Sequence, residues 1–102
     1  MAQYDVADIK RALRNKLEAV PSRSTSHEFY EVFDPEDPDK RLAFTWFSHG
    51  IRVIGDALLQ RMAVELRLPT MKHLRELVEC SLSGPDALGL IRSEAERISS
   101  ER

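Results

Sequence analysis

Residues 26–50 read SHEFYEVFDPEDPDKRLAFTWFSHG and carry the clearest β-pattern in the chain. Two short runs, residues 29–33 and 42–47, are rich in the aromatic and β-branched residues that favour strands. The segment between them contains two prolines and four acidic residues, which is typical of a solvated turn. The pattern therefore predicts an antiparallel hairpin over residues 27–48, with a loop longer than the tight two-residue kind.

The pairing register of this hairpin determines which side chains share a face, because side chains alternate along a strand. If Phe33 lies opposite Arg41, the two histidines His27 and His49 share one face and Trp46 lies on the other. The face with Trp46 would then form the apolar core, and its members are Tyr30, Val32, Leu42, Phe44 and Trp46. A slip of one residue places the histidines on opposite faces and also gives acceptable packing. We favour the first register, and the second stays open.

The rest of the chain shows the 3.6-residue periodicity of helices. Four segments carry it: residues 5–19, 51–66, 71–80 and 84–98. Residues 21–25, PSRST, suit a connector or a short edge strand. The predicted fold class is α+β, in which an N-terminal helix precedes a small antiparallel sheet of two or three strands and then three helices. We expect one domain over residues 1–102, with Trp46 buried against Leu13 or Leu58.

Composition limits the classes of protein to which this chain can belong. Its 102 residues suffice for one core, and no apolar run approaches the length of about 18 residues that a membrane span needs. The single cysteine excludes an internal disulfide, and the charged N-terminus lacks a signal-peptide core, so we expect a cytoplasmic protein. A net charge of −2 argues against strong sequence-independent binding of nucleic acid, although a local basic face is compatible with it.

The chemistry-bearing motifs are few. There is no Gly-rich phosphate loop, so no cofactor is predicted. One cysteine and three separated histidines have no ligand spacing for zinc, and the acidic turn lacks the glycine of a calcium loop, so no metal is predicted. Cys80 is expected to be a small buried hydrophobe. His27, at the start of a strand, is the candidate general acid or base, with a structural role as the alternative.

Three short motifs follow one another in the order found in a known family. Residues 26–30 read SHEFY, residues 48–50 read SHG, and residues 78–83 read VECSLS. In this order they resemble the motifs of the small HicA-type (YcfA-like) toxins, and more closely those of HicA-like bacterial relatives. The resemblance covers residues 5–90.

The resemblance implies a fold like that of double-stranded-RNA-binding domains, with helices on one face of a small antiparallel sheet. It also implies that the protein is the toxin of a toxin–antitoxin system, an endoribonuclease that binds RNA. An antitoxin would block this toxin, and its catalytic histidine would correspond to His27. The side chains expected to bind RNA around it are Ser26, His49, Arg23, Arg52 and Lys16.

Two other functions fit the same residues. The chain could be a protein-interaction module without catalysis, in which the hairpin face or the C-terminal helices bind a partner. It could also be a DNA-binding regulator that uses residues 71–80 as a recognition helix. We rank this last, because Glu76 and Glu79 oppose the few cationic side chains of that helix.

Overall fold

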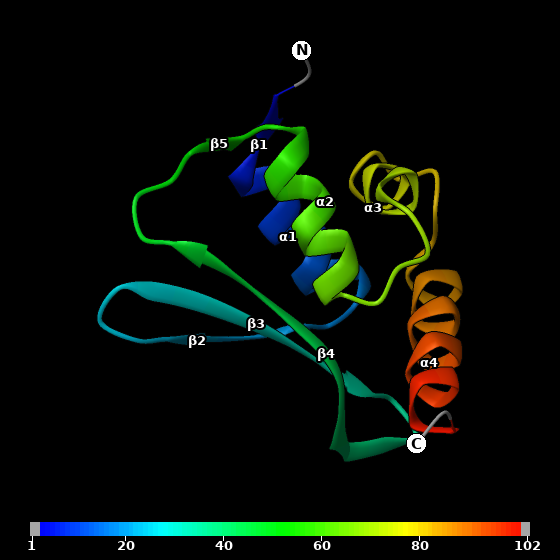
Figure 1. The fold of residues 1–102 in the computed structure, drawn as a ribbon. Helices are drawn as coiled ribbons and strands as arrows, with labels where there is room; N and C mark the ends of the chain where they lie inside the picture. Colours follow the sequence, from blue (N-terminus) through cyan, green and yellow to red (C-terminus); the bar gives the residue numbers. More distant parts are fainter. Residues whose placement is uncertain (1–2, 101–102) are drawn as a thin grey trace.

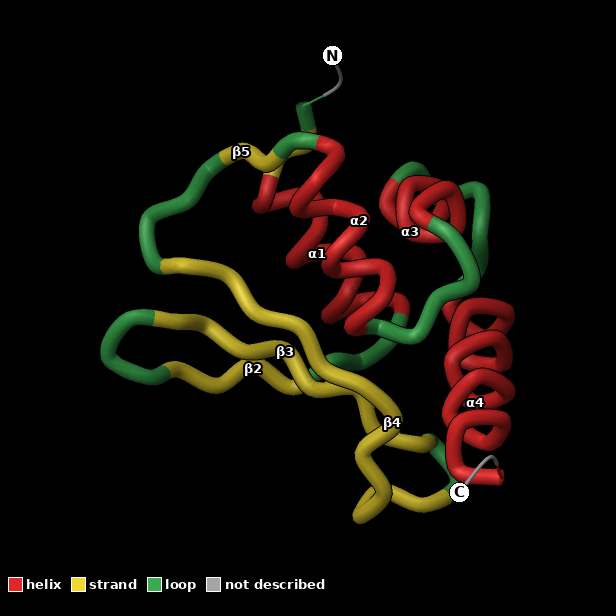
Figure 2. Tube along the Cα trace, viewed as in Figure 1, coloured by secondary structure: helices red, strands yellow, loops and turns green. Residues whose placement is uncertain are grey.

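The structure is a computed structural model that describes residues 3–100 (Figures 1 and 2). Its elements are β1 (Tyr4–Asp5), α1 (Val6–Lys16), β2 (Val20–Arg23), β3 (His27–Asp34), β4 (Asp37–Ser48), β5 (Val53–Ile54), α2 (Asp56–Glu65), α3 (Met71–Val78) and α4 (Gly84–Ser100). The described residues thus form an α+β fold with four helices and two small antiparallel sheets, in the class that the sequence predicts.

The larger sheet has the strand order β2-β3-β4, so β3 lies in the centre and β2 is the short edge strand expected near residues 21–25. Figure 1 shows α1 and α2 side by side over one side of this sheet, with α4 beside its far end. We call the side that α1 and α2 cover the inner face and the opposite side the outer face.

The register between β3 and β4 changes at a β-bulge. Val32 pairs with Ala43 and Phe33 pairs with Arg41, which leaves Leu42 as the extra residue. The predicted pair of Phe33 and Arg41 is present, but residues 27–32 are slipped by one residue, with His27 opposite Ser48. A second shift, between Phe33 and Asp34, pairs Asp34 with Asp37. The favoured register was therefore wrong and the alternative is observed. Strict alternation cannot describe this strand, because the bulge lets both Leu42 and Ala43 be buried.

The bulge also decides which side chains enter the core. The buried inner-face residues of the hairpin are Tyr30, Val32, Ala43, Thr45 and Phe47. Trp46 lies on the outer face and is only half-buried, and Phe44 is 38% exposed. The expectation that Trp46 and Phe44 belong to the core was wrong, because the slipped register turns both outward.

The helices follow the predicted periodicity, with differences at their ends. α2 begins at Asp56 rather than at residue 51, because Val53–Ile54 forms β5 and pairs with β1. Thr70 caps α3 by accepting a hydrogen bond from the His73 amide, and the Ser83 hydroxyl accepts one from the amide of Asp86 in the first turn of α4. Among residues 3–100, none of the helices has the length and apolarity that a membrane crossing requires.

Candidate functional site

His27 lies at the first position of β3, on the outer face and half-buried. Its Nδ1 is 3.1 Å from the hydroxyl oxygen of Ser26. Its ring meets Trp46 edge to face, with ring centroids 4.7 Å apart and planes at 81°, and it lies 6.1 Å from the ring of Phe29. Two aromatic neighbours and one hydrogen bond therefore fix the orientation of this imidazole.

The hydrogen bond to Ser26 leaves the other ring nitrogen of His27 available for chemistry. Within the described part of the chain, Nε2 has no hydrogen-bond partner. A serine hydroxyl can donate or accept, so it can bond to either tautomer of the ring. If Nδ1 donates to Ser26, Nε2 carries a lone pair and can act as a base; if the hydroxyl donates, Nε2 carries the proton and can act as an acid.

Trp46, which supports His27, is itself held at the edge of β4 by α2. Arg61 donates from Nη2 to the Trp46 carbonyl at 2.8 Å, and its guanidinium carbon lies 4.1 Å from the ring centroid of Trp46. Glu65 lies 3.4 Å from Arg61 and accepts a hydrogen bond from the buried hydroxyl of Thr45 at 2.8 Å. Sequence patterns did not indicate Arg61, because only the slipped register brings Trp46 outward.

His49, the second predicted histidine, does not join this site. Its Nε2 lies 2.9 Å from the carbonyl oxygen of Ser24, and its Nδ1 lies 3.6 Å from Glu28. Glu28 pairs with the buried Phe47, so His49 belongs to the inner side of the sheet while His27 lies on the outer face. The expectation that the two histidines share a face was wrong, for the same reason as the register.

The Glu28 carboxylate lies on the inner side, among the basic side chains of Lys10, Arg23 and His49. Lys10 of α1 donates to this carboxylate at 2.6 Å, and Arg23 lies 3.7 Å away. The hydrogen bond from Lys10 lowers the pKa of Glu28 below its ordinary value, and the charges of Lys10, Arg23 and His49 act in the same direction against partial burial. Arg23, predicted to bind RNA, is thus drawn toward this carboxylate, although its side chain is 73% exposed.

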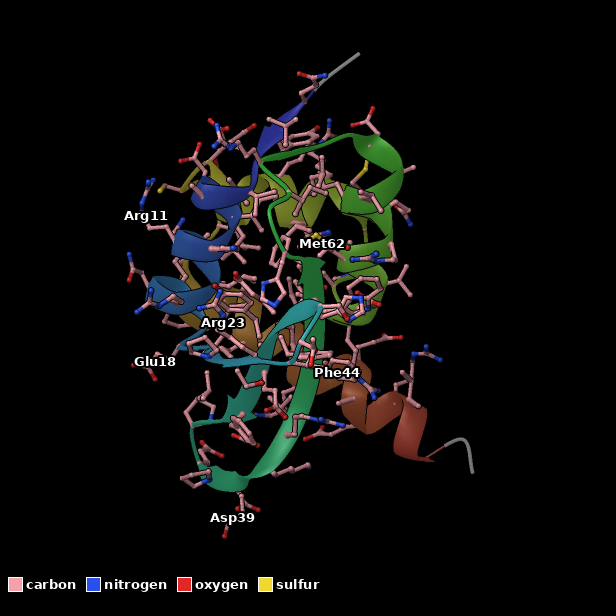
Figure 3. All side chains as sticks on the ribbon, turned by 90° about the vertical axis from the view of Figure 1, so that its left-hand side faces the viewer. Arg11, Glu18, Arg23, Asp39, Phe44 and Met62 are labelled. Atoms are coloured by element: carbon pink, nitrogen blue, oxygen red, sulfur yellow. The ribbon has the colours of Figure 1, made fainter. Side chains whose placement is uncertain are left out.

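The other predicted cationic residues are scattered. Lys16 donates its ammonium to the Leu77 carbonyl at the end of α3, which makes it a structural cap. Arg52 is exposed in the loop before β5, and no hydrogen bond, ion pair or ring contact joins it to His27. Arg11, a further cation of α1, points away from the helix in Figure 3 and is paired with Asp8 at 3.0 Å. The structure therefore gathers Ser26, but neither Lys16 nor Arg52, around His27.

Two further expectations concern metal and thiol chemistry. Residues 3–100 contain no group of three or more His, Cys, Asp or Glu side chains that could hold a metal ion. Cys80 is exposed and adopts a φ of 70° just after α3, so the expectation of a buried thiol was wrong. The chain turns out of the helix at this residue, and the side chain leaves the apolar stripe of α3 with it.

Comparisons with protein-family models, with curated proteins and with solved structures find no match to this chain. A functional proposal therefore depends on the residues and the geometry of the outer face.

Proposed function

We propose that this protein is a HicA-like RNA-binding domain that cleaves RNA, as the toxin of a toxin–antitoxin system, with His27 as its acid–base residue. The observation that carries the proposal is the setting of His27. Its ring is held by Ser26 and Trp46 on the face that α1 and α2 leave open, and its Nε2 has no partner among the described residues.

The order of elements supports a fold like that of double-stranded-RNA-binding domains. From α1 to α2 the chain forms a helix, three antiparallel strands in sequential order, the short strand β5 of the separate β1-β5 sheet, and a second helix. Both helices lie on the same side of the sheet in Figure 1. This arrangement is the one that the resemblance implies, and the antitoxin is the proposed partner that blocks the open face.

The proposed reaction is transfer of the phosphoryl group to the neighbouring 2′-hydroxyl. His27 Nε2 takes the hydroxyl proton while the 2′-oxygen bonds to phosphorus. The bond from phosphorus to the 5′-oxygen breaks, and that oxygen takes a proton from water, which gives a 2′,3′-cyclic phosphate and a 5′-hydroxyl. Positioned proton transfer of this kind contributes about 10²–10⁴-fold to a rate. Ser26 is a positioning residue here, since it acts through the ring of His27.

The two histidines provide the test, because only His27 lies on the open face. In an RNA cleavage assay, or as toxicity on induced expression, His27→Ala should lower activity by about 100-fold or more. His49→Ala is the matched control and should retain most of the activity, since its ring bonds to Ser24 on the other side of the sheet. Circular dichroism checks that both variants fold.

The same experiment separates this proposal from the second candidate, a protein-interaction module without catalysis. The exposed ring of Phe44, on the same face as His27, is the observation that favours that candidate. A wild-type protein that cleaves no RNA, or two histidine variants with full activity, would leave the interaction module as the better reading.

A further inference from the structure

We propose that the outer face of the sheet is a stacking surface for unpaired bases, so that the substrate class is single-stranded RNA. This inference rests on the proposed function and names the kind of RNA that reaches His27. The surface consists of Phe29, Phe44 and Trp46 with His27 at one end, and we call it the aromatic row.

The pairing of the strands places these rings together on one face. Phe29 lies directly opposite Trp46, and Phe44 lies opposite Glu31, one step further along the same face. Side chains on one face of a strand follow each other at two-residue intervals, which is about 6.6 Å along the strand. Phe44 is 38% exposed, whereas the inner-face Phe47 is 2% exposed. Figure 3 labels Phe44 on β4 and Met62 on α2, and Met62 is buried like Phe47.

Two arginines contact the aromatic row, Arg41 from β4 and Arg61 from α2. The guanidinium carbon of Arg41 lies 4.6 Å from the centroid of Phe44, and that of Arg61 lies 4.1 Å from the centroid of Trp46. Aromatic rings and guanidinium planes are the two kinds of protein surface on which splayed-out bases stack, and sheet faces with such rings hold two or three bases. The row therefore offers a sequence-tolerant surface for a short single strand.

The charges beside the aromatic row argue against a duplex as the ligand. Arg41 is paired with Glu31 at 3.0 Å, and Arg61 with Glu65 at 3.4 Å, so each cation has an acidic partner. A duplex turns its bases inward and is held mainly through its phosphates and 2′-hydroxyls, which requires uncompensated positive charge. Stacking needs no such excess, and it requires bases that are free of a partner strand.

The proposed reaction makes the same demand. Attack by the 2′-oxygen requires that oxygen, the phosphorus and the leaving 5′-oxygen to lie in line. A regular duplex holds them out of line, whereas an unpaired nucleotide can turn. A base stacked beside His27, on Phe29 or Trp46, would bring the adjoining sugar and phosphate toward Nε2.

Trp46 provides a direct readout, because it is the single tryptophan of the chain. We would titrate the full chain with 2′-O-methyl oligouridylate, single-stranded or annealed to its complement; the methyl group prevents cleavage. The single strand should quench Trp46 emission and bind at least tenfold more tightly than the duplex. Phe44→Leu, which removes the ring but keeps an apolar side chain, should weaken single-strand binding by about tenfold. Val64→Ala is the control, since Val64 is 63% exposed on α2.

Three results would overturn the inference. One is equal or tighter binding of the duplex, and another is unchanged binding by Phe44→Leu. The third is a wild-type protein that sediments as a dimer and binds no single strand, together with a Phe44→Leu variant that sediments as a monomer. A second copy of the chain would then cover the face. In each case, RNA cleavage that depends on His27 would leave the proposed function standing, so the two failures can be told apart.

Discussion

The two faces of the β2-β3-β4 sheet carry similar side chains in different surroundings. On the inner face, Tyr30 and Phe47 meet edge to face at 5.7 Å and 89°, and both are buried beneath the helices. On the outer face, His27 and Trp46 meet in nearly the same way, at 4.7 Å and 81°, but neither is fully buried. An aromatic pair therefore does not identify the core face of a sheet; the covering elements and the register do.

The largest expected effect tests whether the two faces contribute differently to the free energy of unfolding. Phe47→Ala should lower the free energy of unfolding by about 3–5 kcal/mol, because it opens a cavity beneath α1 and removes the contact with Tyr30. This is much of the total stability of so small a domain. Phe44→Ala should cost about 1 kcal/mol or less, since it loses mainly the stacking of Arg41. Urea denaturation of the two variants measures both values. Similar losses would mean that the outer face is a core face as well.

A second prediction concerns the buried carboxylate at the end of β3. The backbone N–H of Glu36 lowers the pKa of Asp34 most, and the hydrogen bond from Arg92 of α4 at 2.9 Å lowers it further. Because the folded-state pKa lies below the unfolded value of about 4, the stabilisation is complete above that value and is lost as the pH falls through the folded pKa.

Asp34→Asn should therefore destabilise the protein at neutral pH, and the difference from wild type should narrow in acid. Denaturation at about pH 7 and about pH 3 measures this dependence. Glu31→Gln on the outer face is the comparison, because the ion pair of Glu31 with Arg41 is half-exposed. A difference for Asp34→Asn that stays constant over this range would contradict the role of its charge.

The smallest expected effect is that of Arg41→Ala. Arg41 forms an ion pair with Glu31 and stacks on Phe44, but its side chain is 50% exposed, so solvent screens the pair. The loss in the free energy of unfolding should be about 0.2–1 kcal/mol and should shrink at high salt. A loss as large as that of Phe47→Ala would show that the outer face is tightly packed. Thermal unfolding at low and high salt distinguishes these outcomes.

Local patterns in the sequence predict much of this fold. Apolar spacing indicates all four helices of the described residues, and the hydroxyls of Thr70 and Ser83 mark two of their starts. The outer ends of the hairpin, residues 27 and 48, are predicted correctly and agree with the bounds of β3 and β4. These features depend on neighbours in the chain, which is why a single sequence reveals them. The long loop was wrong, because β4 begins at Asp37, which pairs with Asp34 and leaves a two-residue turn.

Features that depend on distant partners could not be predicted. The pairing of β1 with β5 joins segments about half the chain apart, and it shortens α2. In the sequence, Lys16 has the pattern of a solvent-exposed helix cation. Its hydrogen bond to the Leu77 carbonyl depends on the position of α3, which the sequence does not give. Gly84 has no turn role in the sequence pattern, yet a Cβ there would lie 2.2 Å from the Lys16 carbonyl oxygen. In the candidate site, His27 and Ser26 were predicted from the sequence. Trp46 and Arg61 could be assigned to it only once the pairing register of β3 and β4 was known.

The bulge at Leu42 has a consequence at the level of the gene. A single residue, which is one codon, separates the register that buries Trp46 from the register that presents it to solvent. Insertion or loss of that codon would exchange the inner and outer faces of β4 between the bulge and residue 48. The composition of the chain would hardly change. Related chains with the same aromatic residues can therefore differ in whether they have this surface, and the length of the hairpin is the property to compare among them.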